Sequence, residues 1–124
     1  MAQSADFLAQ AVDINGFKLA ALRLPKGING GDLRTVATDI KNRVRDDAAV
    51  IILGSENDGK FPFIAAATDA AIARGVKAGD IVKRFGEFVD GKGGGKPDMA
   101  QGSGANVAGA EEGFSAVKAY LETL

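Results

Sequence analysis

The chain contains no cysteine and no histidine, and these two absences exclude several kinds of chemistry. Without cysteine there is no disulfide, no thiolate nucleophile and no cysteine-ligated zinc site. Without histidine, the commonest general base near neutral pH and the commonest metal ligand are missing. Carboxylates remain as ligands for Mg²⁺ or Ca²⁺. We therefore expect a binding module rather than a self-sufficient enzyme.

Long apolar runs and an excess of one charge are also missing. No run of about 18 apolar residues is present, so we expect no membrane-spanning segment. The N-terminus lacks the basic start and apolar stretch of a secretory signal, and we expect a cytoplasmic location. The net charge of -1 argues against a protein that coats nucleic acid through bulk charge. Any contact with nucleic acid must come from a local basic patch.

The 124 residues suit one domain with one hydrophobic core. Apolar residues at helical spacing predict helices near 33–45, 80–89 and 110–124, and apolar or alternating runs predict strands at 17–24, 48–53 and 61–67. The first strand, the first helix and the second strand indicate a right-handed βαβ crossover. The sequence thus predicts a single-domain α/β fold, with a mixed sheet of four to five strands flanked by α-helices.

Several local signals mark element boundaries. Residues 3–13 carry a helical apolar stripe, which we interpret as the end of a preceding helical region, with 14–124 as the globular domain. Asn15-Gly16 and Asn57-Asp58-Gly59 predict tight turns. Asp32 or Gly31 is expected to cap the helix that follows, and Asp80 is expected to open the next long helix.

The most distinctive feature is the glycine-rich segment, residues 91–104, in which Lys92 and Lys96 flank Gly93, Gly94 and Gly95. Glycine leaves backbone N–H groups open to close approach, so the segment predicts a loop that cradles phosphate. The alternative is a flexible solvent-exposed loop. Within the segment, residues 98–101 are interpreted as the start of a further strand. The P-loop and dinucleotide-binding patterns both fail here, because Asp90, Pro97 and Asp98 occupy positions that those motifs reserve for other residues.

Other side chains lie near this segment in the sequence. Lys83 and Arg84 on the preceding helix extend the basic patch or form a solvated helix face. Asp98 accepts hydrogen bonds either from a base or from amides of its own loop. Three basic residues of the predicted helix 33–45 are interpreted as a solvated face, with RNA contact as the alternative: Arg34, Lys41 and Arg45.

Residues 93–104, Gly-Gly-Gly-Lys-Pro-Asp-Met-Ala-Gln-Gly-Ser-Gly, resemble the signature near the C-terminus of bacterial alanyl-tRNA synthetases. The resemblance includes residues 76–80, 14–16 and 32–34, and covers essentially 13–122. The module resembles the DHH-associated domain, which also closes DHH-type phosphoesterases. In those enzymes the corresponding loop usually ends in histidine and helps to hold substrate phosphate. Lys96 stands there in this chain, which favours charge-based RNA contact over hydrolysis.

The resemblance implies a globular domain that binds the outer corner of tRNA(Ala) and supports aminoacylation and editing without catalysing either. It implies no cofactor in this chain, with ATP, Mg²⁺ and Zn²⁺ held by earlier domains of the parent ligase. Those domains, tRNA(Ala) and a second copy of the chain are the implied partners. The alternatives are the substrate-binding domain of a phosphoesterase acting on nucleic acid or nucleotide phosphate, and a dimerisation module. The predicted contact residues are Lys83, Arg84, Lys92, Gly93, Gly94, Gly95, Lys96, Asp98 and Gln101.

Overall fold

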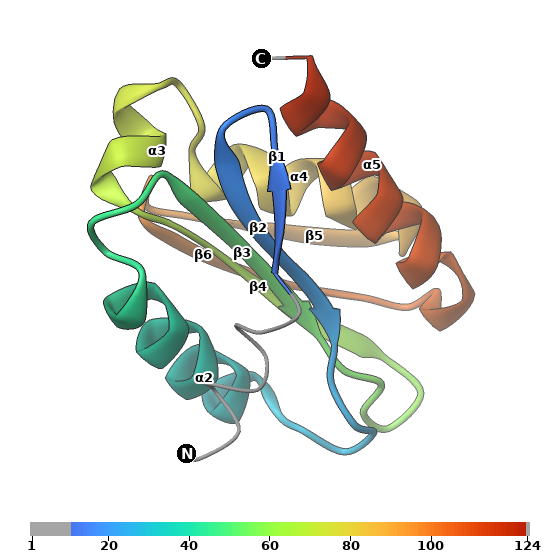
Figure 1. Ribbon diagram of the computed structural model, residues 1–124. Coiled ribbons are helices and arrows are strands. Elements are labelled where there is room, and N and C mark those ends of the chain that lie inside the picture. Colours follow the sequence, from blue (N-terminus) through green and yellow to red (C-terminus); the bar gives the residue numbers. More distant parts are fainter. Residues whose placement is uncertain (1–10, 124) are drawn as a thin grey trace.

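The computed structural model describes residues 11–123, which form one sheet with helices on both of its faces (Figure 1). The strands are β1 Val12–Ile14, β2 Phe17–Arg23, β3 Ala49–Gly54, β4 Phe61–Ala67, β5 Gly91–Gly95 and β6 Met99–Gly104. The helices are α2 Gly30–Arg43, α3 Asp69–Ala73, α4 Ala78–Phe88, the 3-10 helix η1 Val107–Gly109 and α5 Ala110–Glu122.

The described strands are arranged in the order β1-β2-β3-β4-β6-β5. Only β2 and β3 run parallel, and α2 connects them, so the predicted βαβ unit is present. All other neighbours are antiparallel. The mixed α/β fold is confirmed, with six strands in the sheet where four to five were expected. The additional strands come from the two ends of the sheet, β1 and β5.

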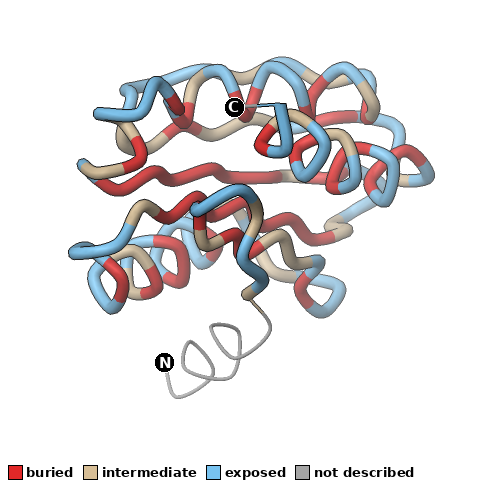
Figure 2. Tube along the Cα trace, turned by 45° about the horizontal axis from the view of Figure 1, so that its top comes forward, coloured by how far each residue is buried: buried red, intermediate tan, exposed pale blue. Residues whose placement is uncertain are grey.

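Two hydrophobic clusters lie on opposite faces of the sheet. Alternate residues of β3 serve both clusters: Val50 and Ile52 pack with α4 and α5, whereas Ile51 and Leu53 pack with α2. In Figure 2 the buried strands form a layer between the helices. A strand buried on both faces needs a continuous apolar sequence, which is why the run 48–53 identified β3 correctly.

The two predicted tight turns are confirmed by backbone geometry. Asn15 and Gly16 have φ angles of 52° and 85° and join β1 to β2. Asp58 and Gly59, at 57° and 76°, join β3 to β4. Positive φ at both central positions matches the twist of antiparallel strands, and these residue types tolerate it.

The predicted helix over residues 3–13 lies mainly outside the described residues. Its last two positions are in β1 instead, where Val12 pairs with Leu19 and Asp13 pairs with Lys18. The helix prediction was wrong for these two positions, because the following turn folds them back onto β2. The proposed boundary between a helical region and the globular domain stays a prediction.

Two of the three predicted helix starts were wrong by two or three residues, and the start at 110 is confirmed. Asn29 caps α2 by accepting a hydrogen bond from the Asp32 N–H at 2.9 Å, so Asp32 lies inside the helix, as does Gly31. Helix α4 begins at Ala78, two positions before Asp80. The Ala78 N–H donates to the carbonyl of Pro97 at 2.7 Å, so a distant segment satisfies this helix end.

Candidate nucleic-acid interface

The glycine-rich segment is a β-hairpin, so its prediction as a loop was wrong. Strands β5 and β6 pair antiparallel from Gly91 with Gly104 to Gly95 with Ala100. The turn closes through two hydrogen bonds between the backbones of Lys96 and Met99, at 3.0 and 3.3 Å. The predicted strand at 98–101 is confirmed as part of β6. Strand β5 forms the outer edge of the sheet.

One side of β5 faces α4, and its glycines are required by packing. A Cβ atom on Gly93 would collide with Cγ1 of Val82 on α4 and lie 2.6 Å from the carbonyl oxygen of Gln101. A Cβ on Gly91 would lie 2.5 Å from the carbonyl oxygen of Ser103. These glycines allow α4 and β6 to approach the backbone of β5 closely. Gly93 is therefore explained by the fold.

Gly94 has a different environment, because its side of the strand points away from α4. A Cβ on Gly94 would meet no heavy atom within 4 Å, and the residue is exposed. Its cross-strand partner Gln101 pairs in turn with Ile64, which belongs to the cluster beneath α2. Neither packing nor a positive φ angle requires glycine at position 94.

The α2 side of β5 and β6 is open to solvent, and we call it the open face. Since side chains alternate along a strand, Lys92 and Gly94 lie on this side together. Lys96 pairs with Met99, which packs against the α2 cluster, and so faces the same way. Lys92 and Lys96 are both exposed. The predicted grouping of two lysines around a bare backbone is thus present, on a strand face rather than in a loop.

Side chains from α2 reach over the edge of the open face. The Nη1 group of Arg34 donates to Oε1 of Gln101 at 3.2 Å, and Nε2 of Gln101 donates to the carbonyl of Gly30 at 2.9 Å. Lys41 forms an ion pair with Oδ2 of Asp98 at 3.2 Å. A hollow of about 300 Å³ lies between them and is lined by Arg34, Gly94, Gly95, Lys96, Asp98, Met99, Ala100 and Gln101.

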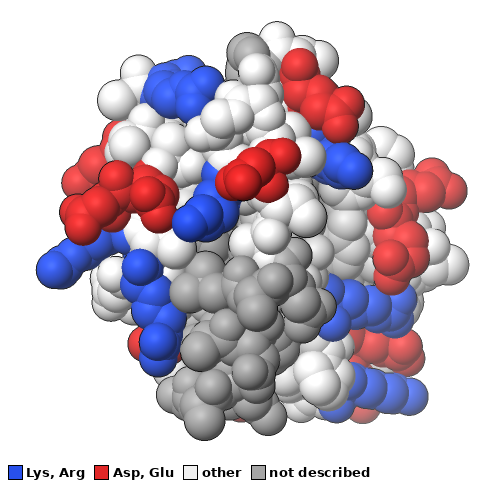
Figure 3. Space-filling model, in the orientation of Figure 1, with Lys and Arg blue, Asp and Glu red and all other residues white. Residues whose placement is uncertain are grey.

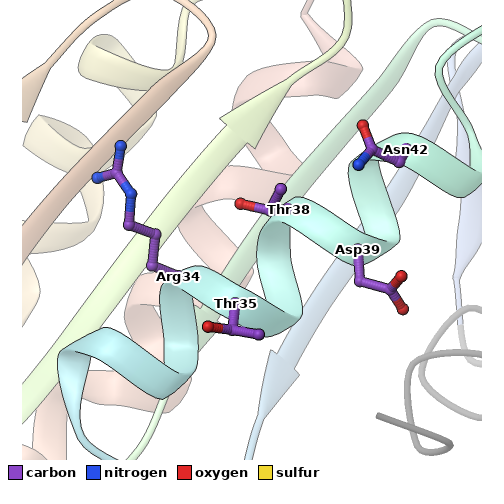
Figure 4. A pocket seen from close by; sticks show the side chains of 5 residues that line it. All are labelled: Arg34, Thr35, Thr38, Asp39 and Asn42. Atoms are coloured by element: carbon purple, nitrogen blue, oxygen red, sulfur yellow. The ribbon is translucent and has the colours of Figure 1, made fainter.

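Arg34 and Lys41 were expected on a solvated helix face, with RNA contact as the alternative. Arg34 is exposed and Lys41 is half-buried, and the structure places both beside the hairpin. No local sequence pattern linked Arg34 to Gln101, which is 67 positions away, or Lys41 to Asp98, which is 57 positions away. Their separation of seven residues, two helical turns, was the one signal that they share a face of α2. Arg34 also borders a shallow hollow along the outer side of α2, with Thr35, Thr38, Asp39 and Asn42 (Figure 4).

Lys83 and Arg84 are exposed on α4, on the other side of the sheet. Arg84 stacks its guanidinium over the ring of Tyr120, with 3.8 Å from Cζ to the ring centroid. Lys83 and Lys77 line a second hollow of about 260 Å³ that reaches Gly94 and Gly95 from the α4 side. The predicted contact residues therefore fall on two faces, and Lys77 is a basic residue that the sequence did not single out.

Charge on the molecule is otherwise mixed. On the face seen in Figure 3, basic and acidic side chains alternate over the described surface. Within residues 11–123 no group of three or more acidic side chains is placed to hold a metal ion. No helix in the same range is long and apolar enough to cross a bilayer.

The hydrogen bond from Lys41 lowers the pKa of Asp98, and partial burial opposes this effect. We expect Lys41→Met to raise the Asp98 pKa towards its ordinary value, measured by NMR titration of the carboxyl group. Lys96→Ala is the control and should raise the pKa less, because Lys96 acts only through space. Since the folded-state pKa is lowered, the pair stabilises the fold above the ordinary carboxyl pKa, and this contribution is lost as the pH falls through the folded value. An unchanged pKa in Lys41→Met would show that the ion pair is absent in solution.

Comparison with known proteins places this architecture in a family. The model of the DHHA1 domain matches residues 16–123. The chain belongs to the DHHA1 domain family. This DHHA1 domain is 51% identical over its whole length to alanine–tRNA ligase of Corynebacterium glutamicum, and 42% identical over 98% of its length to that of Nocardia farcinica. It spans 14% of the length of each of these relatives.

Solved structures share the fold of the DHHA1 domain. The C-Ala domain of alanyl-tRNA synthetase from Aquifex aeolicus superposes with a TM-score of 0.79 at 23% identity, covering 91% of this chain and 98% of that one. A pGpG-specific phosphodiesterase from Vibrio cholerae superposes with a TM-score of 0.56 at 11% identity, covering 98% of this chain and 39% of that one. At these identities the likeness concerns the fold alone.

Proposed function

We propose that this DHHA1 domain is the C-terminal tRNA-binding domain of an alanine–tRNA ligase. It binds the outer corner of tRNA(Ala) and supports aminoacylation and editing without catalysing either reaction. The observation that carries the proposal is the exposed row of Lys92, Gly94 and Lys96, in which Gly94 has no packing reason to be glycine. Identity of 51% with a curated ligase over the whole chain supports the same assignment.

The parent ligase supplies what this chain lacks. In this proposal ATP, Mg²⁺ and Zn²⁺ are bound by its other domains. For zinc, this chain has no histidine or cysteine that could form a site of the family's kind. In this proposal those domains belong to the same ligase as this chain. The ligase acts in the cytoplasm. A homodimer stays a prediction.

The physical basis of binding is electrostatic attraction plus close fit. When lysines bind phosphates, they displace counterions from the nucleic acid, so the affinity falls as the salt concentration rises. A bare backbone at Gly94 lets a phosphate or a 2′-hydroxyl approach the strand. With a net charge of -1, the isolated domain is expected to bind with a dissociation constant on the order of micromolar or weaker. Tethering to the ligase raises the effective concentration and compensates for this weakness.

A second candidate is the substrate-binding domain of a DHH-type phosphoesterase, which the sequence resemblance also allows; the structural likeness to a pGpG-specific phosphodiesterase concerns the fold alone. Lys96 argues against it, because the resemblance implies that DHH-type phosphoesterases usually carry histidine at that position. Lysine offers a permanent positive charge near neutral pH, which suits binding of a phosphate backbone better than proton transfer.

The double variant Lys92→Ala/Lys96→Ala tests the proposal by titration with a transcript of tRNA(Ala) at two salt concentrations. We expect at least tenfold weaker binding at low salt and a salt slope smaller by about 1.5, because two phosphate contacts are lost. The matched control is Lys26→Ala/Lys118→Ala, which removes the same charge from two exposed lysines on other elements. Equal affinity of the double variant and the wild type would overturn the proposed site.

A further inference from the structure

We infer that Arg34 binds a backbone phosphate of the nucleic acid on the open face, and that Gln101 is a positioning residue that holds Arg34 there. This inference rests on the proposed function and deepens it. The inference gives Gln101 a supporting role in place of the predicted contact. It adds Arg34 to the site, for which the sequence favoured a solvated helix face over RNA contact.

Both polar atoms of the Gln101 side chain are already hydrogen-bonded within the protein. Its Nε2 donates to the carbonyl of Gly30 at 2.9 Å, and its Oε1 accepts from Nη1 of Arg34 at 3.2 Å. Gly30 is the first residue of α2, so the amide joins the start of that helix to the middle of β6. Gln101 is half-buried, which favours one fixed orientation of its amide.

Arg34 keeps most of its donors available. One Nη1 group bonds Gln101, and the guanidinium makes no other hydrogen bond or ion pair to the residues that the structure describes. A guanidinium presents five N–H donors in a flat fork that matches two oxygens of a phosphate. Because the hydrogen bond to Gln101 fixes one side of the fork in advance, less entropy is lost when the other side binds.

The charge around the hollow of about 300 Å³ favours an anion. Arg34 and Lys96 line it, and the only acidic group in its lining, Asp98, is already paired with Lys41 at 3.2 Å. The lining thus carries an excess of positive charge beside the bare backbone of Gly94. A phosphodiester satisfies both features, since it brings charge for the guanidinium and oxygens for the strand.

The experiment titrates a transcript of tRNA(Ala) against this 124-residue chain, four variants and one control variant at two salt concentrations. Arg34→Ala should bind about tenfold more weakly at low salt, with a salt slope smaller by about one. Arg34→Lys should keep the wild-type slope while binding a few-fold more weakly, because the charge remains and the fork is lost. Gln101→Ala should weaken binding less than Arg34→Ala. The double variant Arg34→Ala/Gln101→Ala should bind no more weakly than Arg34→Ala alone, because Gln101 acts through Arg34.

Arg43→Ala is the matched control. Arg43 is nine residues from Arg34, so it lies on the opposite side of α2, and it pairs with Asp39 at 3.1 Å.

Three outcomes would contradict the inference. If Arg34→Ala binds tRNA as tightly as Arg43→Ala does, Arg34 does not contact a phosphate. Additive losses in the double variant overturn the positioning role and show that Gln101 contacts RNA itself. A wild-type chain that binds no RNA overturns the proposed function as well as this inference. Thermal unfolding of every variant separates loss of binding from loss of fold.

Discussion

Gly93→Ala is expected to lower the free energy of unfolding by about 2 to 3 kcal/mol. The new methyl group would collide with Cγ1 of Val82 and lie 2.6 Å from the carbonyl oxygen of Gln101. Neither atom can move freely, because Val82 is fully buried and the carbonyl belongs to a paired strand. Relief of the contact requires separation of α4 from β5 or distortion of the hairpin. Urea unfolding monitored by circular dichroism measures the loss.

Gly94→Ala, one residue further along, is the matched control. Its methyl group would meet no atom within 4 Å, and its φ angle is not in the left-handed region. The free energy of unfolding should be unchanged or rise by up to about 1 kcal/mol, since alanine restricts the unfolded chain. Binding of tRNA should nevertheless weaken, because the methyl group stands on the open face. Equal destabilisation by both substitutions would contradict the assignment of the two sides of β5.

Phe85→Ala is expected to cost about 3 to 5 kcal/mol of stability. Phe85 is fully buried on α4, and its ring lies 4.8 Å from Phe63, 4.9 Å from Phe114 and 5.8 Å from Phe61, measured between centroids. Removal of the ring leaves a cavity between the sheet, α4 and α5 that the surrounding strands cannot fill. Chemical denaturation followed by circular dichroism gives the difference.

Phe85→Leu is the control for this substitution. Leucine fills much of the same volume, so we expect a loss of less than half that of alanine. A loss below about 1 kcal/mol for Phe85→Ala would mean that the cluster collapses around the cavity.

The hairpin of β5 and β6 combines two requirements on opposite sides. Towards α4, Gly91 and Gly93 lack side chains because a helix and a strand lie against them. On the open face, Lys92 and Lys96 project with Gly94 between them. Alternation along one strand thus separates residues that serve the fold from residues proposed to serve binding.

The sequence by itself determined the elements whose signals are local. Asn15-Gly16 and Asp58-Gly59 identified two hairpin turns, because positive φ angles depend on residue type. The apolar run of β3 and the stripe of Leu33, Val36 and Ile40 on α2 identified buried elements, because burial selects a fixed periodicity. The parallel βαβ unit followed from the order of these elements.

Only the tertiary structure decided the form of the glycine-rich segment. Glycines have no side chains to alternate, so no periodicity marked Gly91–Gly95 as a strand. Pairing with β6 and packing against α4 fixed it there. The start of α4 likewise depends on the carbonyl of Pro97, and the roles of Arg34 and Lys41 depend on Gln101 and Asp98. These partners are far apart in the chain, and their contact free energy exists only once the sheet has brought them together.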